Sequence, residues 1–174
     1  MIIRIEPWGP DDLPLLRKTM GDPAMTEHLG GPEGEEQLVA RHAKYQRVAS
    51  DRTGRMFKIV SDETGEAVGS VGYWERDWQG DQVYESGWLV IPEFQGRGIA
   101  RAATALVIDA ARAERKHRFL HAFPSIHNLP SNTICRRLGF ELRDECEFEF
   151  PPGNLMRCND WRYDLWLPDR LVRS

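Results

Sequence analysis

The stretch from Glu85 to Arg101 constrains the fold most, because its hydrophobic pattern changes period in the middle. Residues 83–91 form a run of β-branched, aromatic and apolar residues that is typical of a strand, and Pro92 ends it. Beyond Gly98 the apolar residues recur at i, i+3 and i+4 spacing as far as Ala113, which predicts an amphipathic helix. The chain therefore places a strand, a glycine-rich loop and a helix in direct succession.

The glycine-rich loop, residues 95–98, leads into the first turn of that helix. The first backbone N–H groups of a helix lack acceptors within it, and the helix dipole adds positive potential there. Gly96 and Gly98 allow a ligand to approach the backbone, and Arg97 and Arg101 add positive charge. These features favour a diphosphate site, although a simple turn explains the loop alone equally well. Neither the P-loop signature nor the third glycine of a dinucleotide fingerprint follows.

The bulk properties of the chain exclude several classes of function. Its 174 residues suffice for one domain with a hydrophobic core, and a net charge of −4 argues against nucleic acid as the main partner. No apolar run approaches the roughly 20 residues of a membrane span, and the N-terminus lacks the plan of a signal peptide. The three cysteines show no C-x-x-C spacing, so neither a disulfide framework nor a metal site is indicated. We expect a soluble protein of the reducing cytoplasm, without a membrane or metal partner.

The remaining pattern mixes strands and helices, with no repeat and no long linker. Between Glu141 and Phe150 the sequence alternates, so that Cys146, Phe148 and Phe150 face one way and the intervening glutamates the other. The pattern predicts a single α/β (α+β) domain over residues 1–174, with a twisted, mostly antiparallel mixed sheet flanked by helices. Strands are expected at residues 2–6, 56–61, 67–74, 83–91, 119–123, 141–150 and 159–167, and helices at 11–19, 33–49, 99–113 and 131–138.

Two motifs carry a resemblance to a known family. The pattern Gln95-x-x-Gly98-x-Ala100 resembles the acetyl-CoA pyrophosphate loop of the GNAT superfamily of N-acetyltransferases. The downstream pattern Asn128-x-x-Ser131-x-x-Ile134-Cys135-x-x-Leu138-Gly139-Phe140 is similar to the segment that closes the other side of the cofactor. The resemblance covers nearly the whole chain, and the most similar subgroup contains the ribosomal-protein N-terminal (alanine/serine) acetyltransferases. It implies a GNAT-like fold in which two parallel strands, residues 82–90 and 119–123, splay apart to form the acetyl-CoA cleft.

The resemblance also implies which residues contact the cofactor. Backbone N–H groups near Leu89 and Val90 would stabilise the thioester oxygen as it gains charge, and Asn128 would hold the pantetheine arm. Many members of the superfamily have a tyrosine in the second motif that protonates the leaving thiolate, and this chain has Cys135 there. Cys135 fits the role of a small buried packing residue better than that of a reactive thiol. The expected cofactor-binding residues are Leu89, Val90, Gln95, Gly96, Arg97, Gly98, Ile99, Ala100, Arg101, Asn128, Ser131 and Cys135.

Glu85 is the candidate general base, because it lies on the strand expected to border the cofactor and matches a glutamate of the subgroup. A glutamate with the ordinary pKa of ~4.3 is a poor base for an amine, so burial would have to raise the pKa of Glu85. A carboxylate paired across the sheet or exposed to solvent is the alternative interpretation. Ser131 is the second candidate catalytic residue, as a donor to the leaving sulfur, although a helix cap at this position explains it equally well.

The sequence leaves the amine acceptor open. A protein N-terminus or a small molecule such as an aminoglycoside or a polyamine fits the resemblance, and a homodimer remains possible. The row Glu145, Glu147 and Glu149 either attracts a cationic amine or forms a solvated strand face, and three tryptophans, Trp74, Trp78 and Trp161, either stack on a substrate or pack the core. The missing tyrosine keeps one alternative function open, a catalytically weak acetyl-CoA-binding sensor or partner module.

Overall fold

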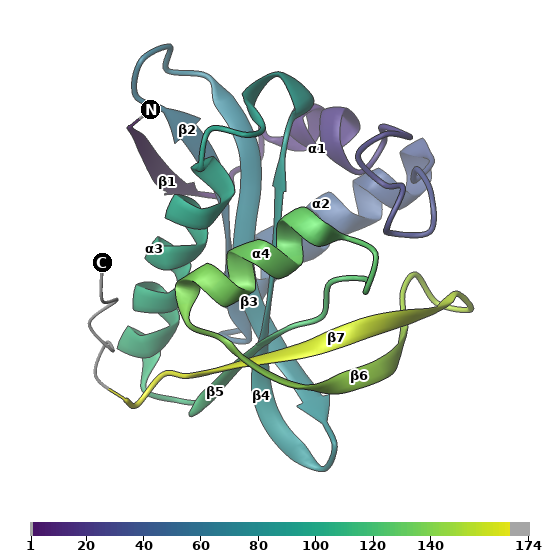
Figure 1. Ribbon diagram of the computed structural model, residues 1–174. Coiled ribbons are helices and arrows are strands. Elements are labelled where there is room, and N and C mark those ends of the chain that lie inside the picture. The colour runs from purple at the N-terminus through teal and green to yellow at the C-terminus, as the bar shows by residue number, and fades with distance from the viewer. Residues whose placement is uncertain (1, 168–174) are drawn as a thin grey trace.

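The computed structural model describes residues 2–167, and within this range seven strands form one mixed sheet in the order β1-β2-β3-β4-β5-β7-β6. Four α-helices and a short 3-10 helix complete this part of the chain (Figure 1). The strands are β1 (Ile3–Pro7), β2 (Gly54–Ser61), β3 (Ala67–Trp78), β4 (Asp81–Val90), β5 (Phe119–Ala122), β6 (Glu141–Glu149) and β7 (Leu155–Asp164). The helices are α1 (Leu13–Thr19), α2 (Glu35–Ser50), η1 (Pro92–Phe94), α3 (Ile99–Glu114) and α4 (Leu129–Leu138).

The helices form two layers, with α1 and α2 on one face of the sheet and α3 and α4 on the other (Figure 1). The predicted amphipathic helix is confirmed, but its buried face differs from the expected one. Ile99 and Ala103 are buried as expected, whereas Ala102, Leu106 and Ala113 are exposed, and Val107 and Ala111 are buried instead. Tyr73 of β3 faces this helix and donates its hydroxyl to Glu114 at 2.7 Å. Since side chains alternate along a strand, the next residue, Trp74, faces α1 and α2 instead.

Only two residue pairs join β4 to β5, which run parallel: Tyr84 with Leu120 and Glu85 with His121. Beyond these pairs β4 continues along β3 alone, while the chain after Ala122 leaves the sheet as a loop. The strands therefore diverge at Glu85, and the expected splay of two parallel strands is confirmed. The predicted α/β (α+β) class with a mostly antiparallel sheet is confirmed too, because β4 and β5 are the parallel pair and the other pairings between named strands are antiparallel.

Several predicted boundaries were wrong, and strand β3, for example, extends to Trp78 instead of ending at residue 74. Helix α4 begins at Leu129 rather than at residue 131, because Asn128 is its N-cap and accepts the N–H of Ser131 at 3.1 Å. Strand β7 begins at Leu155, where it pairs with Glu149 of β6, and ends at Asp164 instead of residue 167. None of the helices in residues 2–167 is long and apolar enough to cross a membrane.

Candidate active site

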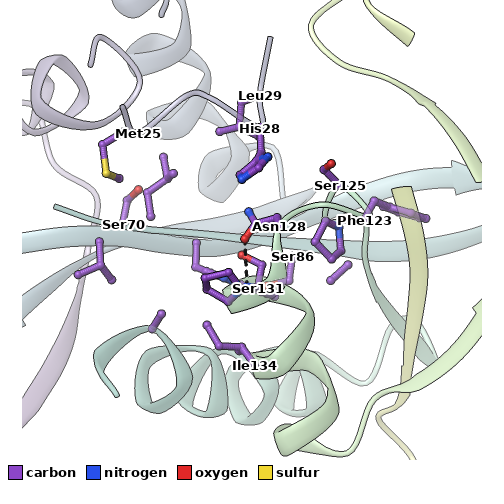
Figure 2. Close-up of a pocket in the computed structure, with 18 of the residues that line it drawn as sticks. Met25, His28, Leu29, Ser70, Ser86, Phe123, Ser125, Asn128, Ser131 and Ile134 are labelled. Atoms are coloured by element: carbon purple, nitrogen blue, oxygen red, sulfur yellow. Dashed lines mark hydrogen bonds between the residues drawn. The ribbon is translucent and has the colours of Figure 1, made fainter. Parts of the chain in front are cut away.

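A cavity of about 930 Å³ opens where β4 and β5 diverge. Its lining comes from both layers: the segment between α1 and α2 on one side, and the N-terminal ends of α3 and α4 on the other. Figure 2 shows His28 and Leu29 on the opposite side of this cavity from Ser131 and Ile134, with Asn128 between them. One continuous space therefore reaches from the glycine-rich loop through the gap in the sheet.

The glycine-rich loop has the geometry of an anion cradle. Gly96 and Gly98 adopt left-handed φ angles of +73° and +77°, and a Cβ added to either would meet no protein atom within 4 Å. The N–H groups of Ile99, Ala100 and Arg101 lie in the first turn of α3, where no helical acceptor exists for them. Open space beside unpaired N–H groups at a helix N-terminus fits a diphosphate.

The side chains around this loop divide into two roles. Arg101 lines the cavity, whereas Arg97 does not and lies over the ring of Phe94, with 5.3 Å between the guanidinium carbon and the ring centroid. Gln95 lines the cavity and donates to the carbonyl oxygen of Val90 at 2.9 Å, which ties the loop to the end of β4. The charge expected at the anion cradle is thus supplied by Arg101 rather than by Arg97.

The open edge of β4 presents backbone groups to the gap. Ile91 donates its N–H to the carbonyl of Val68 in β3, and the hydrogen-bonding direction alternates along a strand. This alternation turns the N–H of Val90 toward the gap and that of Leu89 toward β3. Both residues line the cavity, but Val90 is the one whose N–H can reach a ligand there.

The three candidate residues of the second motif, Asn128, Ser131 and Cys135, have different environments at the start of α4. Because Asn128 caps the helix, the hydroxyl of Ser131 is not needed as a cap. Ser131 lines the cavity, and its hydroxyl has no hydrogen-bond partner within residues 2–167. Cys135 is fully buried in the hydrophobic core and does not line the cavity, and burial raises the pKa of its thiol to about 12. The structure thus corrects the expectation that Cys135 contacts the cofactor, because the neighbouring Ile134 faces the cavity instead.

Asn132, which the sequence analysis did not select, holds α4 against the sheet. Its side chain is buried and donates to the carbonyls of Ser125 and Asn128 at 2.9 and 2.8 Å. Its carbonyl oxygen accepts from Asn159 at 2.7 Å and from the indole of Trp161 at 2.8 Å. The sequence feature that could have identified Asn132 is its position as a polar residue on the inward face of a predicted helix. Trp161 is therefore a buried structural residue and not a stacking platform.

Glu85 lies at the vertex of the divergent strands and lines the cavity, with only 9% of its surface exposed. Its carboxylate accepts from Arg76 at 2.7 Å and from the indole of Trp74 at 3.1 Å. Burial raises the pKa of Glu85, and the positive charge of Arg76 opposes that rise. This carboxylate is paired across the sheet and also faces the cavity, so its role as a general base stays a prediction.

A second buried pair lies next to Glu85. His121, the partner of Glu85 in β5, has its Nδ1 2.6 Å from Asp160, which also accepts from the indole of Trp78 at 3.0 Å. His121 and Asp160 are 39 positions apart, so no local sequence pattern indicated the pair. Trp78 is engaged in this pair, and of the three candidate tryptophans Trp74 alone lines the cavity.

The glutamate row of β6 is a solvated face. Glu145, Glu147 and Glu149 are exposed, whereas Phe148 and Phe150, which point the opposite way, line the cavity. The predicted alternation is confirmed, and the idea that this row attracts an amine into the site was wrong. Among the residues described here, no group of His, Cys, Asp and Glu side chains could hold a metal ion.

Comparisons with known proteins agree with this geometry. The family model described as an acetyltransferase (GNAT) domain matches residues 3–141. An acetyltransferase from Agrobacterium tumefaciens str. C58 has 23% identity, with 92% of this chain and 90% of that chain covered and a TM-score of 0.76. A search of curated proteins found no significant match.

Two further solved structures are similar in fold and belong to acetyltransferases with named substrates. A spermidine N-acetyltransferase from Vibrio cholerae, in complex with CoA and spermine, has 14% identity, covers 94% of this chain and 95% of its own, and has a TM-score of 0.76. An acetyl transferase from Salmonella typhimurium that modifies the N-terminal serine of ribosomal protein L7/L12 has 16% identity, coverage of 93% and 94%, and a TM-score of 0.73. At these sequence identities the similarity shows a shared fold and nothing more specific.

Gly98→Val should weaken binding of coenzyme A at least about tenfold, or ~1.4 kcal/mol, because the new side chain fills the open space of the anion cradle. Gly65→Val is the matched control: its φ is +72°, nothing lies within 4 Å of a Cβ there, and it lies in the turn between β2 and β3. Both variants carry the same backbone strain, so they should lose similar thermal stability. Calorimetric titration measures the affinities, and an unchanged affinity in Gly98→Val would remove the loop from the site.

Proposed function

The chain belongs to the acetyltransferase (GNAT) domain family, and from this membership we propose that it transfers an acetyl group from acetyl-CoA directly to a primary amine. The observation that supports this proposal best is the continuous cavity that joins the anion cradle to Glu85 through the gap between β4 and β5. A sensor that only binds acetyl-CoA has no use for the part of the cavity beyond Glu85, which Tyr45, Phe148 and Phe150 line. The proposal therefore favours an enzyme over the sensor module.

The proposal covers residues 1–174 as one acetyltransferase domain in the cytoplasm. Cys135, Cys146 and Cys158 are all free thiols, although Cys146 and Cys158 lie opposite each other on β6 and β7. Unpaired cysteines in such a position fit a reducing compartment. A homodimer is compatible with the proposal but no part of the site described above depends on one.

Each part of the cavity has a role in holding acetyl-CoA. The cradle of Gly96, Gly98 and the first turn of α3 would bind the diphosphate, with Arg101 as the nearby cation. Asn128 and Ser131, which line the cavity at the start of α4, would contact the pantetheine arm and the sulfur. The acetyl carbonyl would then lie in the gap, where the backbone N–H of Val90 can stabilise the charge on its oxygen.

The amine must lose a proton to become a nucleophile. At pH 7 this costs about 4–5 kcal/mol for a lysine-like amine with a pKa of ~10.4, and only about 1 kcal/mol for an α-amine with a pKa near ~8. Glu85 is the carboxylate that would accept this proton, directly or through a water molecule. Its buried position raises its pKa, which makes it a better base than an exposed glutamate.

Titration of acetyl-CoA into the purified protein, followed by an assay of thiol release with primary amines, tests the proposal. We expect saturable binding and release of free CoA that depends on an added amine. Binding without thiol release from any amine would favour the sensor module, and the absence of binding would contradict both functions.

Glu85→Gln should lower kcat about 100-fold at neutral pH, the lower end of what a general base contributes. The amide keeps the shape of the side chain and can still accept from Trp74 and Arg76, so the fold should be retained. A base acts only when it is deprotonated, so in the native enzyme kcat should rise with pH through the raised pKa of Glu85. The variant should lack this rise, and an unaltered pH–rate profile would exclude Glu85 from the reaction.

Ser131→Ala should lower kcat about tenfold, or ~1.4 kcal/mol, because it removes the hydroxyl that can donate to the leaving sulfur. Cys135→Ala is the control from the same helix, since Cys135 faces the core and should affect stability but not kcat. Steady-state kinetics at saturating acetyl-CoA separate the two variants. A large loss of kcat in Cys135→Ala together with a normal Ser131→Ala would reverse the roles assigned to them.

A further inference from the structure

We propose that the acceptor is a primary amine with a single positive charge on an aromatic or other apolar body, and that polyamines are poor substrates. The inference rests on the proposed function and concerns the part of the same cavity beyond Glu85. Its basis is the composition of that part: an aromatic wall, one carboxylate already paired, and no second acidic group.

The aromatic wall consists of five side chains from separate parts of the chain that line the cavity. They are Tyr45 of α2, Trp74 of β3, Phe123 after β5, Phe148 of β6 and Phe150 at the end of β6. The rings of Phe123 and Phe148 stack at a centroid distance of 4.7 Å and an interplanar angle of 24°. Such a wall binds a flat apolar body by burying its surface and by ring packing.

A guanidinium group already lies over one face of four of these five rings, those of Tyr45, Phe123, Phe148 and Phe150. The guanidinium of Arg76 lies 4.2 Å from the ring centroid of Phe148, and that of Arg41 lies 5.9 Å from Tyr45 and 5.5 Å from Phe150. An aromatic ring attracts an ammonium group only if its face is available. The wall is therefore an apolar surface and not a cage for a second ammonium.

Glu85 is the only carboxylate among the described residues that line the cavity. It is paired with Arg76, and the charge of Arg41 is balanced by Glu33, with 2.9 Å between the Arg41 Nε and a carboxylate oxygen. His28, Arg101 and Arg137 also line the cavity and add no negative charge. The carboxylate of the site is thus paired before the amine enters, and Arg101 and Arg137 make the rest of the lining positive rather than negative.

A buried ammonium needs a counter-charge, since removing a charge from water without a partner is costly. One ammonium can interact with Glu85 and lose its proton there, but a second one on the same substrate meets no free carboxylate. The rest of the substrate packs against the rings of the aromatic wall. This combination selects against diamines, polyamines and aminoglycosides, and for monoamines with an apolar body.

Matched amines test the proposal in the native enzyme. We expect kcat/KM for hexylamine to exceed that for 1,6-diaminohexane at least tenfold, and 2-phenylethylamine to exceed ethylamine by a similar factor. The first pair changes only the number of charges, and the second pair changes only the aromatic body. A preference for 1,6-diaminohexane, or equal rates with ethylamine and 2-phenylethylamine, would overturn the inference while leaving the acetyltransferase function in place.

The same chemistry can come from a free amine or from a protein N-terminus, and a peptide distinguishes the two. A Phe-Gly-Gly-Gly peptide turned over faster than 2-phenylethylamine would identify an N-terminal aromatic residue as the source, and the reverse order would identify a free arylalkylamine. Both results support the inference. If neither these compounds nor a wider panel of amines led to thiol release, that result would contradict the proposed function itself, and the inference with it.

Arg41→Gln provides a test within the protein. Arg41 lines the cavity, so the change removes a positive charge from its wall and leaves the adjacent Glu33 without this partner. A second ammonium then meets less repulsion, and the ratio of kcat/KM for 1,6-diaminohexane over hexylamine should rise at least tenfold. Arg17→Gln is the matched control, because it releases Glu35 from an exposed ion pair outside the cavity and should leave the ratio unchanged. A ratio measured on one preparation does not depend on the fraction of folded enzyme. An unchanged ratio in Arg41→Gln would contradict the charge argument.

Discussion

The short parallel pairing between β4 and β5 is the constraint on which the site depends. Two residue pairs join the strands, and past Glu85 the edge of β4 has no neighbour in the sheet. A buried backbone edge needs hydrogen-bond partners, so an open edge inside a sheet is a place where a ligand can bind. The gap also connects the two faces of the sheet. A cofactor at the N-terminal ends of α3 and α4 and an acceptor against α2 and the segment before it can therefore meet at Glu85.

The groups around that meeting point are paired before any ligand arrives. Glu85 with Arg76 and Arg41 with Glu33 each neutralise a charge that burial would otherwise make costly, and His121 is hydrogen-bonded to Asp160. The pairs also fix side-chain positions, because each member comes from a different element. The geometry of the acceptor half is therefore a property of the fold, and the substrate has few free charges to which it can adapt.

The sequence predicted best what is encoded locally. The period change around residues 95–98 indicated the strand, the cradle and the helix, and all three are present. Two predictions for α4 failed because small differences in position decide them. Asn128 and Ser131 are equally good N-caps by residue type, so the start of the helix was placed wrongly. Ile134 and Cys135 point in directions about 100° apart around the helix, so the residue that faces the cavity was chosen wrongly. Partners such as Arg76 for Glu85 or Asp160 for His121 depend on strand register and long-range packing, which no local pattern specifies. The aromatic wall was missed for the same reason.

The aromatic wall links selectivity to catalysis. In water, moving a proton from a lysine-like amine with a pKa of ~10.4 to a glutamate with a pKa of ~4.3 costs about 8 kcal/mol, and from an α-amine with a pKa near ~8 about 5 kcal/mol. Burial against the wall raises the pKa of Glu85 and would lower the pKa of an amine beside it, so both changes reduce this cost. Arg76 limits the rise for Glu85 but also keeps the carboxylate in place. An environment that disfavours a second charge on the substrate is thus the same one that favours removing the first.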